Sequence, residues 1–274
     1  MSRRRFAVWG DPIAHSKSPA LHAAAYRVLG LDWEYTRRQV SAEGFAAALG
    51  SLDPSWRGLS LTMPLKEEAF RAAAVRDRHA EMTGAVNTLL LGEKPAGFNT
   101  DVGGIIDALA EGGVRDVATV RILGAGATAA SSLVAVAGIG AQRADVRARR
   151  ADRASGLVDL GARLGVQVSI AGLDQEADPV DLTLATLPGG TVLPEETVSK
   201  LASAGGALFD AAYSPWPSTL SAGWGDGVVV SGLGMLLHQA VRQIRIFLQG
   251  DPDGALPDEA AVISAMRDSL GAER

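Results

Sequence analysis

The residue of this chain best suited to transfer a proton is Lys66. The segment Ser60–Glu67 predicts a strand that ends near Thr62 and a helix whose first turn contains Lys66. The positive end of a helix lowers the pKa of a nearby ammonium group, which prepares it for acid–base catalysis at neutral pH. An ordinary surface lysine is the alternative. Lysine is rare here, however, because the 26 basic residues include only Lys17, Lys66, Lys94 and Lys200, and arginine cannot release a proton as lysine can.

A carboxylate partner for Lys66 is Asp101, which completes Asn99-Thr100-Asp101 at the expected end of a strand. Sheets bind their ligands beyond the carboxyl ends of strands, so Lys66 and Asp101 are expected to meet across a cleft between two domains. The carboxylate would then fix the position of the ammonium group. The alternative is that Asp101 only caps the helix that follows.

Two serines and four histidines are the other polar residues that the sequence singles out. Ser16 and Ser18 place two hydroxyls at the start of a helix, where they could bind a carboxylate, although capping alone is the alternative. His15 and His22 suit a structural role as well as a functional one. The remaining two are expected at the surface or in packing, and the four histidines do not follow a metal-ligand spacing. We therefore predict no metal site.

A glycine-rich turn, Gly124-Ala125-Gly126-Ala127-Thr-Ala129, follows an expected strand and opens a helix of small residues. The first glycine permits the tight turn, the second lets the backbone approach a pyrophosphate, and alanine at the third position lets the helix pack on the sheet. The helix N-terminus offers N–H groups and partial positive charge to phosphates. This context favours a dinucleotide site over a turn without a ligand.

The end of the next strand distinguishes between the two nicotinamide cofactors. NAD sites usually place an acidic residue about 20 residues after the turn, to bind the ribose 2′-hydroxyl. This chain has Arg149, Arg150 and Arg153 there instead. Guanidinium groups bind a 2′-phosphate, whereas a carboxylate would repel it. We therefore predict NADP rather than NAD, with a solvated basic loop as the alternative.

Around these residues, short apolar runs alternate with amphipathic helices, which predicts an α/β protein. In the N-terminal part, strands are expected over 6–10, 33–40, 57–63, 87–91 and 96–100, with helices opened by Ser18-Pro19, Ser41 and Pro64. From about Val102 the pattern repeats βαβ units, which predicts a doubly wound parallel sheet. Its strands are expected over 118–123, 144–149, 166–170, 181–186, 207–212 and 228–231, with helices over 127–137 and 153–164. The chain then ends in helices expected over 234–248 and 258–270.

Composition excludes several classes of protein. Apolar residues make up 47% and charged residues 21%, which is ordinary for a globular protein and not for a disordered one. No apolar run approaches the roughly 18 residues of a membrane helix. Cysteine is absent, which excludes disulfides and thiolate chemistry, and the net charge of −5 argues against a general affinity for nucleic acid. The first apolar stretch ends too soon for a secretory signal, so the cytoplasm is the expected compartment.

Taken together, these segments resemble the shikimate dehydrogenase family, within the shikimate/quinate dehydrogenases and closest to an actinobacterial-like branch. The matching stretches occur in the family's order and span nearly the whole chain. They are Gly10–Pro19, Leu61–Lys66, Gly84–Thr88, Asn99–Asp101, Gly124–Gly126, Asp210–Pro215 and Gly232–Gln239.

The resemblance implies an enzyme that reduces 3-dehydroshikimate reversibly to shikimate with NADPH, in aromatic amino-acid biosynthesis. It implies that Lys66 and Asp101 form the catalytic pair and that Ser16 and Ser18 hold the substrate carboxylate. It assigns the ring hydroxyls to Thr62, Asn87, Asp101 and Gln239, and places Tyr213 on the carboxylate side. Cofactor contacts are implied for Gly124, Ala125, Gly126, Ala127, Arg149, Arg150, Arg153, Gly232 and Met235. The implied partners are small molecules only, with neither nucleic acid nor membrane, and the expected state is a monomer or homodimer.

The resemblance and the βαβ run together predict two domains. Residues 1–101 with 236–274 are expected to form the substrate-binding domain, and residues 102–235 the Rossmann-type NADP domain. The sequence departs from the family's pattern at Leu184, which replaces a polar residue near the cofactor, and at Ala148 and Arg150, where an arginine is gained. The alternatives are a quinate/shikimate dehydrogenase acting on a related polyol acid and a nucleotide-binding sensor without catalysis.

Overall fold

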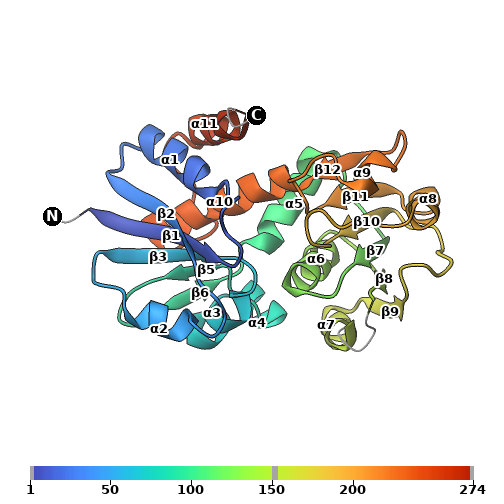
Figure 1. The fold of residues 1–274 in the computed structure, drawn as a ribbon, viewed down its shortest axis with the longest axis horizontal. Coiled ribbons are helices and arrows are strands. Elements are labelled where there is room, and N and C mark those ends of the chain that lie inside the picture. The colour runs from blue at the N-terminus through green and yellow to red at the C-terminus, as the bar shows by residue number, and fades with distance from the viewer. Residues whose placement is uncertain (1–2, 150–153, 272–274) are drawn as a thin grey trace. The chain divides into compact units, whose positions relative to one another are not determined.

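The computed structural model describes residues 3–149 and 154–271, which form two compact units (Figure 1). Unit 1 consists of Met1–Thr100 and Leu236–Arg274, and unit 2 consists of Asp101–Met235. The helix α10 (Gly232–Gln249) begins in unit 2 and ends in unit 1. Each unit has its own sheet.

Unit 1 contains a mixed sheet in the order β2-β1-β3-β5-β6-β4. The strands β1, β2 and β3 are parallel, β5 runs antiparallel to β3 and β6, and β4 pairs in parallel with β6. Their bounds are β1 (Arg4–Gly10), β2 (Trp33–Gln39), β3 (Trp56–Leu61), β4 (Val75–Arg76), β5 (Thr88–Leu90) and β6 (Ala96–Phe98). The predicted strand pair over 87–91 and 96–100 is confirmed as the antiparallel pair β5–β6.

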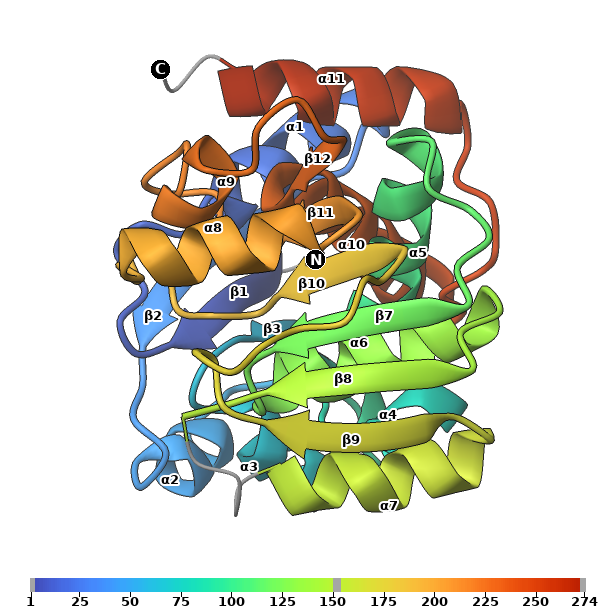
Figure 2. The same cartoon turned by 90° about the vertical axis from the view of Figure 1, so that its right-hand side faces the viewer.

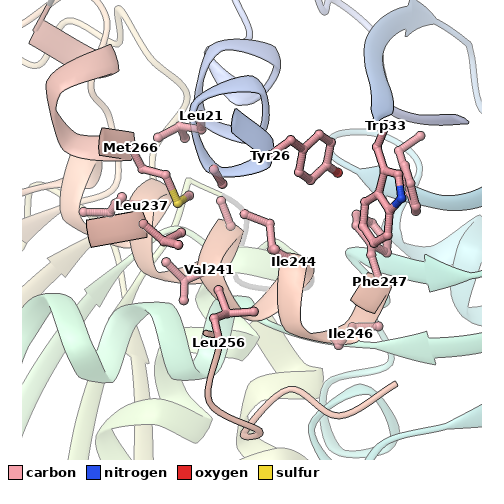
Figure 3. Close-up of a cluster of buried hydrophobic side chains, with 14 residues drawn as sticks. Leu21, Tyr26, Trp33, Leu237, Val241, Ile244, Ile246, Phe247, Leu256 and Met266 are labelled. Carbon is pink, nitrogen blue, oxygen red and sulfur yellow. The ribbon is translucent and has the colours of Figure 1, made fainter. Parts of the chain in front are cut away.

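Helices cover both faces of this sheet (Figure 1). Alternate residues of β1 point to opposite sides, so Phe6 packs in one apolar cluster and Trp9 in the other. The first cluster joins the sheet to α1 (Ser18–Val28), α10 and α11 (Glu259–Gly271), and Figure 3 shows Leu21, Val241 and Met266 of these helices converging. The second cluster joins it to α2 (Phe45–Gly50), α3 (Lys66–Ala72) and α4 (Arg78–Thr83).

The predicted helix starts in unit 1 need correction. Ser18 is the first residue of α1 and not its N-cap, which is Lys17; the Ser16 hydroxyl accepts the Ser18 N–H at 3.3 Å. Ser41 accepts the N–H of Gly44 in a turn, and α2 begins only at Phe45. Pro64 precedes the N-cap of α3, so the helix begins at Lys66 itself. The sequence analysis did not predict β4 or α4, which are only two and six residues long.

Unit 2 contains a parallel sheet in the order β12-β11-β10-β7-β8-β9. The chain enters at β7, winds outward to β9, and returns to β10 on the other side of β7. This is the predicted doubly wound arrangement, with its switch point between β7 and β10. In Figure 2 the arrows of β7, β8 and β9 run side by side in one direction. The bounds are β7 (Thr119–Leu123), β8 (Arg143–Arg147), β9 (Gln167–Ala171), β10 (Leu182–Ala185), β11 (Ala207–Asp210) and β12 (Val229–Ser231).

The helices of unit 2 are α5 (Asp101–Glu111), α6 (Ala127–Gly138), α7 (Ser155–Leu164), α8 (Glu195–Ser203) and α9 (Thr219–Ala222). Figure 2 shows α6 behind the sheet and α8 in front of it. Leu201 of α8 and Trp224 pack with Leu123 and Leu208 of the sheet in one buried cluster. The sequence analysis did not predict α8 or α9, whose apolar positions are few.

Two buried arginines share one aspartate in the sheet of unit 2. Arg121 is fully buried and its Nε lies 2.9 Å from Asp145 Oδ2, while Arg147 Nε lies 2.7 Å from Asp145 Oδ1. The remaining guanidinium N–H groups of Arg147 bind the carbonyls of Gly172, Gln175 and Glu176. Asp145 therefore compensates two charges that the sheet removes from water.

Replacing Asp145 with alanine is expected to destabilise unit 2 strongly. Removing one partner of a buried ion pair costs about 3–5 kcal/mol, because the remaining charge stays buried without compensation. The measurement is equilibrium urea unfolding followed by circular dichroism. The control is Asp159→Ala, an exposed aspartate on α7, which is expected to change the free energy of unfolding by less than about 0.5 kcal/mol. Equal effects of the two substitutions would contradict the role of Asp145.

Candidate active site

The turn between β7 and α6 contains two glycines, Gly124 and Gly126, that differ in backbone conformation and in the space around them. Gly124 has φ +115°, and a Cβ there would lie 2.5 Å from Thr186 Oγ1, so the fold itself requires glycine. Gly126 has an ordinary φ of −97°, and a Cβ there would meet no atom of the described residues within 4 Å. Nothing in the described chain therefore requires glycine at 126. Space kept open at this point suits the close approach of a ligand.

The start of α6 has the features of an anion site. Gly126 is its N-cap and provides no side-chain cap, and the first turn contains no acidic residue. The first N–H groups of a helix lack intrahelical partners and carry partial positive charge. Ala127 is half-buried, and Ala129 is fully buried where the helix meets the sheet. The turn Gly124–Ala127 therefore fits the pyrophosphate of a dinucleotide.

The arginine run after β8 divides between two roles. Arg147 is the last residue of β8 and turns inward to Asp145, so it is unsuited to a ligand. Arg149 lies two residues beyond the strand end and is exposed, whereas the predicted strand extended to it. Arg150 and Arg153 lie outside the described residues. Of the three arginines predicted to contact the phosphate, Arg149 is the one that lies within the described residues, and its contact with a phosphate stays a prediction.

In unit 1, two amide side chains implied by the resemblance, those of Asn87 and Gln239, meet at Thr100. Asn87 Nδ2 donates to Thr100 Oγ1 at 2.9 Å, and Asn87 Oδ1 accepts the N–H of Thr100 at 2.9 Å. Gln239 Oε1 lies 3.5 Å from Thr100 Oγ1, and Gln239 Nε2 donates to the carbonyl of Leu236. Asn87, Thr100 and Gln239 are all buried. The structure thus brings Asn87 and Gln239 together, although they are 152 positions apart in the sequence.

Backbone hydrogen bonds bring Thr62 and Lys66 to the same edge of the sheet as Asn87. The Leu61 N–H donates to the carbonyl of Asn87 at 2.7 Å, and the Val86 N–H donates to the carbonyl of Lys66 at 3.0 Å. Thr62 N–H donates to the carbonyl of Trp9. A Cβ at Gly10 would lie 2.3 Å from Thr62 Cγ2, so glycine at 10 makes room for this threonine. Lys66 is half-buried as the first residue of α3.

The loop that carries Ser16 is attached to β2. Arg37 donates to the carbonyl of Ala14 at 2.6 Å and to that of Ser16 at 3.5 Å. Ser18 is buried, and a hydrogen bond joins its side chain to that of Tyr35. Both serines therefore lie at the start of α1, as predicted, but Ser18 is held by a tyrosine that the sequence analysis did not consider.

A second set of contacts fixes the segment that precedes Asp101. Asp77 caps α4 by accepting the N–H of Ala80, and the same carboxylate oxygen accepts the N–H of Asn99 at 3.2 Å. Asn99 Nδ2 donates to Thr83 Oγ1 at 2.9 Å. Asp101 is buried and is the first residue of α5. It opens unit 2, whereas Lys66 belongs to unit 1.

Tyr213 lies in the loop after β11, which Asp210 organises. Asp210 accepts the N–H of Ala212 at 3.0 Å and the Ser218 hydroxyl at 2.5 Å. Burial raises the pKa of the Tyr213 phenol, so this side chain is neutral at physiological pH. A Cβ at Gly232 would lie 2.2 Å from the carbonyl oxygen of Ala211, so this glycine is explained by the loop itself. Met235 is buried in α10.

Sequence reasoning missed Tyr35, Ser60, Thr100 and Gln243, all polar residues within unit 1. Gln243 follows Gln239 by four positions on α10, which places both on one helix face. That spacing could have drawn attention to it. Tyr35 and Ser60 carry no comparable signal, because each lies within an ordinary strand pattern.

Neither a metal-binding cluster nor a membrane-spanning helix occurs in the described part of the chain. No group of three or more histidine, aspartate or glutamate side chains could hold a metal ion in residues 3–149 and 154–271. In the same part of the chain, every helix is too short or too polar to cross a membrane.

One unit is doubly wound and contains a glycine-rich turn that suits phosphate, and the other α/β unit gathers amide and hydroxyl side chains. This arrangement is typical of two-domain dinucleotide-dependent enzymes. Comparison with known proteins identifies the family. The substrate-binding domain of shikimate dehydrogenase matches residues 8–89. An NADP(+)-type shikimate dehydrogenase from Alkalilimnicola ehrlichii is 32% identical and aligns with 96% of this chain and 98% of its own.

Two solved structures extend the match to three dimensions. Shikimate dehydrogenase from Mycobacterium tuberculosis has 36% sequence identity and a TM-score of 0.81, with 97% of this chain and 99% of that chain covered. A shikimate 5-dehydrogenase from Thermus thermophilus, in complex with NADP(H) and shikimate, has 31% identity and a TM-score of 0.80, with 97% and 100% covered. This chain belongs to the shikimate dehydrogenase family.

Proposed function

We propose that this protein is an NADP-dependent oxidoreductase of the cytoplasm that reduces 3-dehydroshikimate reversibly to shikimate, in the biosynthesis of aromatic amino acids. The observation that carries the proposal is its similarity, over nearly the whole chain, to a Thermus thermophilus enzyme whose structure contains both NADP(H) and shikimate. Unit 1 would bind shikimate and unit 2 would bind NADP, with the protein acting as a monomer or homodimer.

For the substrate, the proposal assigns the carboxylate to the hydroxyls of Ser16 and Ser18, with Tyr213 assisting. The ring hydroxyls would contact Thr62, Asn87, Asp101 and Gln239. The arrangement of Asn87 and Gln239 around Thr100 supports a common role for these two amides. Amide groups suit this task because each presents both a donor and an acceptor to a hydroxyl.

For the chemistry, Lys66 and Asp101 would form the catalytic pair. NADPH, when bound, supplies the hydride that reduces the ketone carbon. Lys66 Nζ would donate its proton to the ketone oxygen as negative charge develops there, and its own charge would stabilise that oxygen. Asp101 would orient the ammonium group and bind a ring hydroxyl. In the reverse direction Lys66 would take the proton back.

For the cofactor, the backbone of Gly124, Ala125, Gly126 and Ala127 would hold the pyrophosphate. The open space at Gly126 supports this assignment, because no described protein atom lies within 4 Å of a Cβ at this position and glycine is therefore not needed for packing. Arg149, Arg150 and Arg153 would bind the 2′-phosphate, and Gly232 and Met235 would lie near the nicotinamide ring.

The test of the proposed function is a panel of two substrates and two cofactors. Shikimate oxidation with NADP is expected to exceed any reaction with NAD, because the exposed Arg149 follows the strand end after the turn. It is also expected to exceed quinate oxidation, as the family resemblance implies. Faster quinate oxidation, above all with NAD, would favour the alternative of a quinate/shikimate dehydrogenase. Cofactor binding without turnover of either acid would indicate a sensor.

Replacing Arg149 with alanine is expected to raise the KM for NADPH about tenfold and to leave the KM for NADH nearly unchanged. A hydrogen bond to a charged group contributes about 1.5–3 kcal/mol, and only NADPH carries the 2′-phosphate. Steady-state kinetics with each cofactor measures both constants. Arg163→Ala, on α7, serves as the matched control. Equal effects of Arg149→Ala on the two cofactors would overturn the assignment.

A further inference from the structure

A line of polar side chains runs through unit 1 and joins two of the proposed substrate contacts, Ser18 and Asn87. The residues between these two ends are Tyr35 of β2, Ser60 of β3, Gln243 of α10 and Thr88 of β5. Ser60, Gln243 and Thr88 are between 0% and 3% exposed. Burying a polar group costs free energy unless it is hydrogen-bonded. Each donor and acceptor along this line therefore needs a hydrogen-bond partner.

The first half of the line leads from Ser18 to Gln243. The Tyr35 hydroxyl donates to Ser60 Oγ at 2.7 Å, and Ser60 Oγ donates to Gln243 Oε1 at 2.8 Å. Because the Tyr35 hydroxyl donates its hydrogen bond to Ser60, it acts as the acceptor in the hydrogen bond that joins it to Ser18. Burial raises the pKa of the Tyr35 phenol, so it remains a neutral donor.

The second half leads from Gln243 to Asn87. Gln243 Nε2 donates to Thr88 Oγ1 at 3.1 Å, and Thr88 Oγ1 donates to Asn87 Oδ1 at 2.8 Å. The N–H of Thr100 also donates to Asn87 Oδ1. These two donors fix which end of the Asn87 amide carries the oxygen, and Nδ2 consequently faces Thr100 Oγ1.

Gln243 sets the direction of the whole line, because it accepts at one atom and donates at the other. His22 reinforces this orientation. Desolvation lowers the pKa of His22 to about 3, so its ring is neutral. With a proton on Nε2, His22 donates to Gln243 Oε1 at 3.3 Å, and Nδ1 accepts from the Tyr26 hydroxyl at 3.1 Å. The same ring stacks on Tyr35 at 3.8 Å between centroids.

We infer that Gln243 is a positioning residue for the substrate: it orients the Asn87 amide through Thr88, and the Ser18 hydroxyl through Ser60 and Tyr35. The inference rests on the proposed function, which makes Ser18 and Asn87 substrate contacts. The side chain of Gln243 thereby orients both Ser18, the proposed contact of the substrate carboxylate, and Asn87, a proposed contact of a ring hydroxyl.

The first test replaces Gln243 with methionine, which has similar size and cannot donate. The KM for shikimate is expected to rise about tenfold, as for the loss of oriented hydrogen bonds, with the KM for NADP within about twofold of the wild-type value. The matched control is Gln249→Met, at the exposed end of the same helix. A residue needed only for stability would lower the melting temperature and the active fraction without moving the KM for shikimate, and that result would overturn the inference.

The second test uses a conservative pair at Thr88, which guards against misfolding of the Gln243 variant. Thr88→Val keeps the shape and removes the hydroxyl, and is expected to raise the KM for shikimate about tenfold. Thr88→Ser restores the hydroxyl and is expected to stay within about threefold of the wild type. Equal KM values for the two variants would contradict the inference. A wild-type protein that does not oxidise shikimate would instead contradict the proposed function, so the two failures are distinguishable.

Discussion

Replacing Lys66 with alanine is expected to lower kcat for shikimate oxidation by about 10²–10⁴-fold, the contribution typical of a general acid–base. The side chain would be lost at the first residue of α3, while backbone hydrogen bonds of Leu61 and Val86 keep that edge of the sheet in place. The fold should therefore survive, and the loss should lie in turnover. Steady-state kinetics, with circular dichroism to verify folding, provides the measurement.

One further variant separates the effect of proton transfer from that of positive charge, and another serves as a control. Lys66→Arg retains a positive charge that arginine does not release, so it is expected to be nearly as slow as Lys66→Ala. Lys94→Ala, at an exposed position between β5 and β6, is the matched control and should keep wild-type turnover. A decrease below about tenfold for Lys66→Ala, or full activity of Lys66→Arg, would exclude Lys66 as the general acid–base. A wild-type protein that binds the cofactor and shows no turnover would instead point to a sensor.

The fold of unit 2 could be predicted because its βαβ repeats produce long, regular patterns. The turn at Gly124 and the parallel, doubly wound sheet around it follow from the same sequence signal. Element boundaries were less accurate, because the predicted strand extended to Arg149, whereas β8 ends at Arg147. The arginines of this run look alike in the sequence. Only the structure distinguishes them, because Arg147 is buried and Arg149 is exposed.

The site of unit 1 was predicted in its parts and not in its connections. Asn87 and Gln239 were implied by resemblance, but their common partner Thr100 depends on how β5, the turn after β6 and α10 pack. Gln243 and Tyr35 are polar residues on faces that otherwise pack in the core. A single sequence cannot tell a buried polar residue from an exposed one, because hydrogen bonds between distant residues decide which is tolerated.

Gly126 provides the second large effect, because it separates stability from cofactor binding. Gly126→Asp places a carboxylate at the N-cap of α6, where the backbone is already extended and a Cβ meets no described atom. Aspartate is a favoured N-cap residue, so the melting temperature is expected to stay equal or rise. The carboxylate would take the N–H groups that are proposed to bind the pyrophosphate and would repel its charge. Losing two hydrogen bonds to a charged group, at about 1.5 kcal/mol each, lowers affinity for NADPH about 100-fold or more.

The measurement is NADPH affinity by fluorescence titration, together with the melting temperature and the KM for shikimate. Gly44→Asp is the matched control, because it makes the same change at the N-cap of α2 in unit 1, where no ligand is proposed. That variant should bind NADPH as the wild type does. If Gly126→Asp keeps wild-type affinity, the open space at this glycine does not serve the pyrophosphate, and the cofactor must contact unit 2 elsewhere. If its affinity and stability fall together, the glycine is structural, and the distinction drawn between Gly124 and Gly126 is wrong.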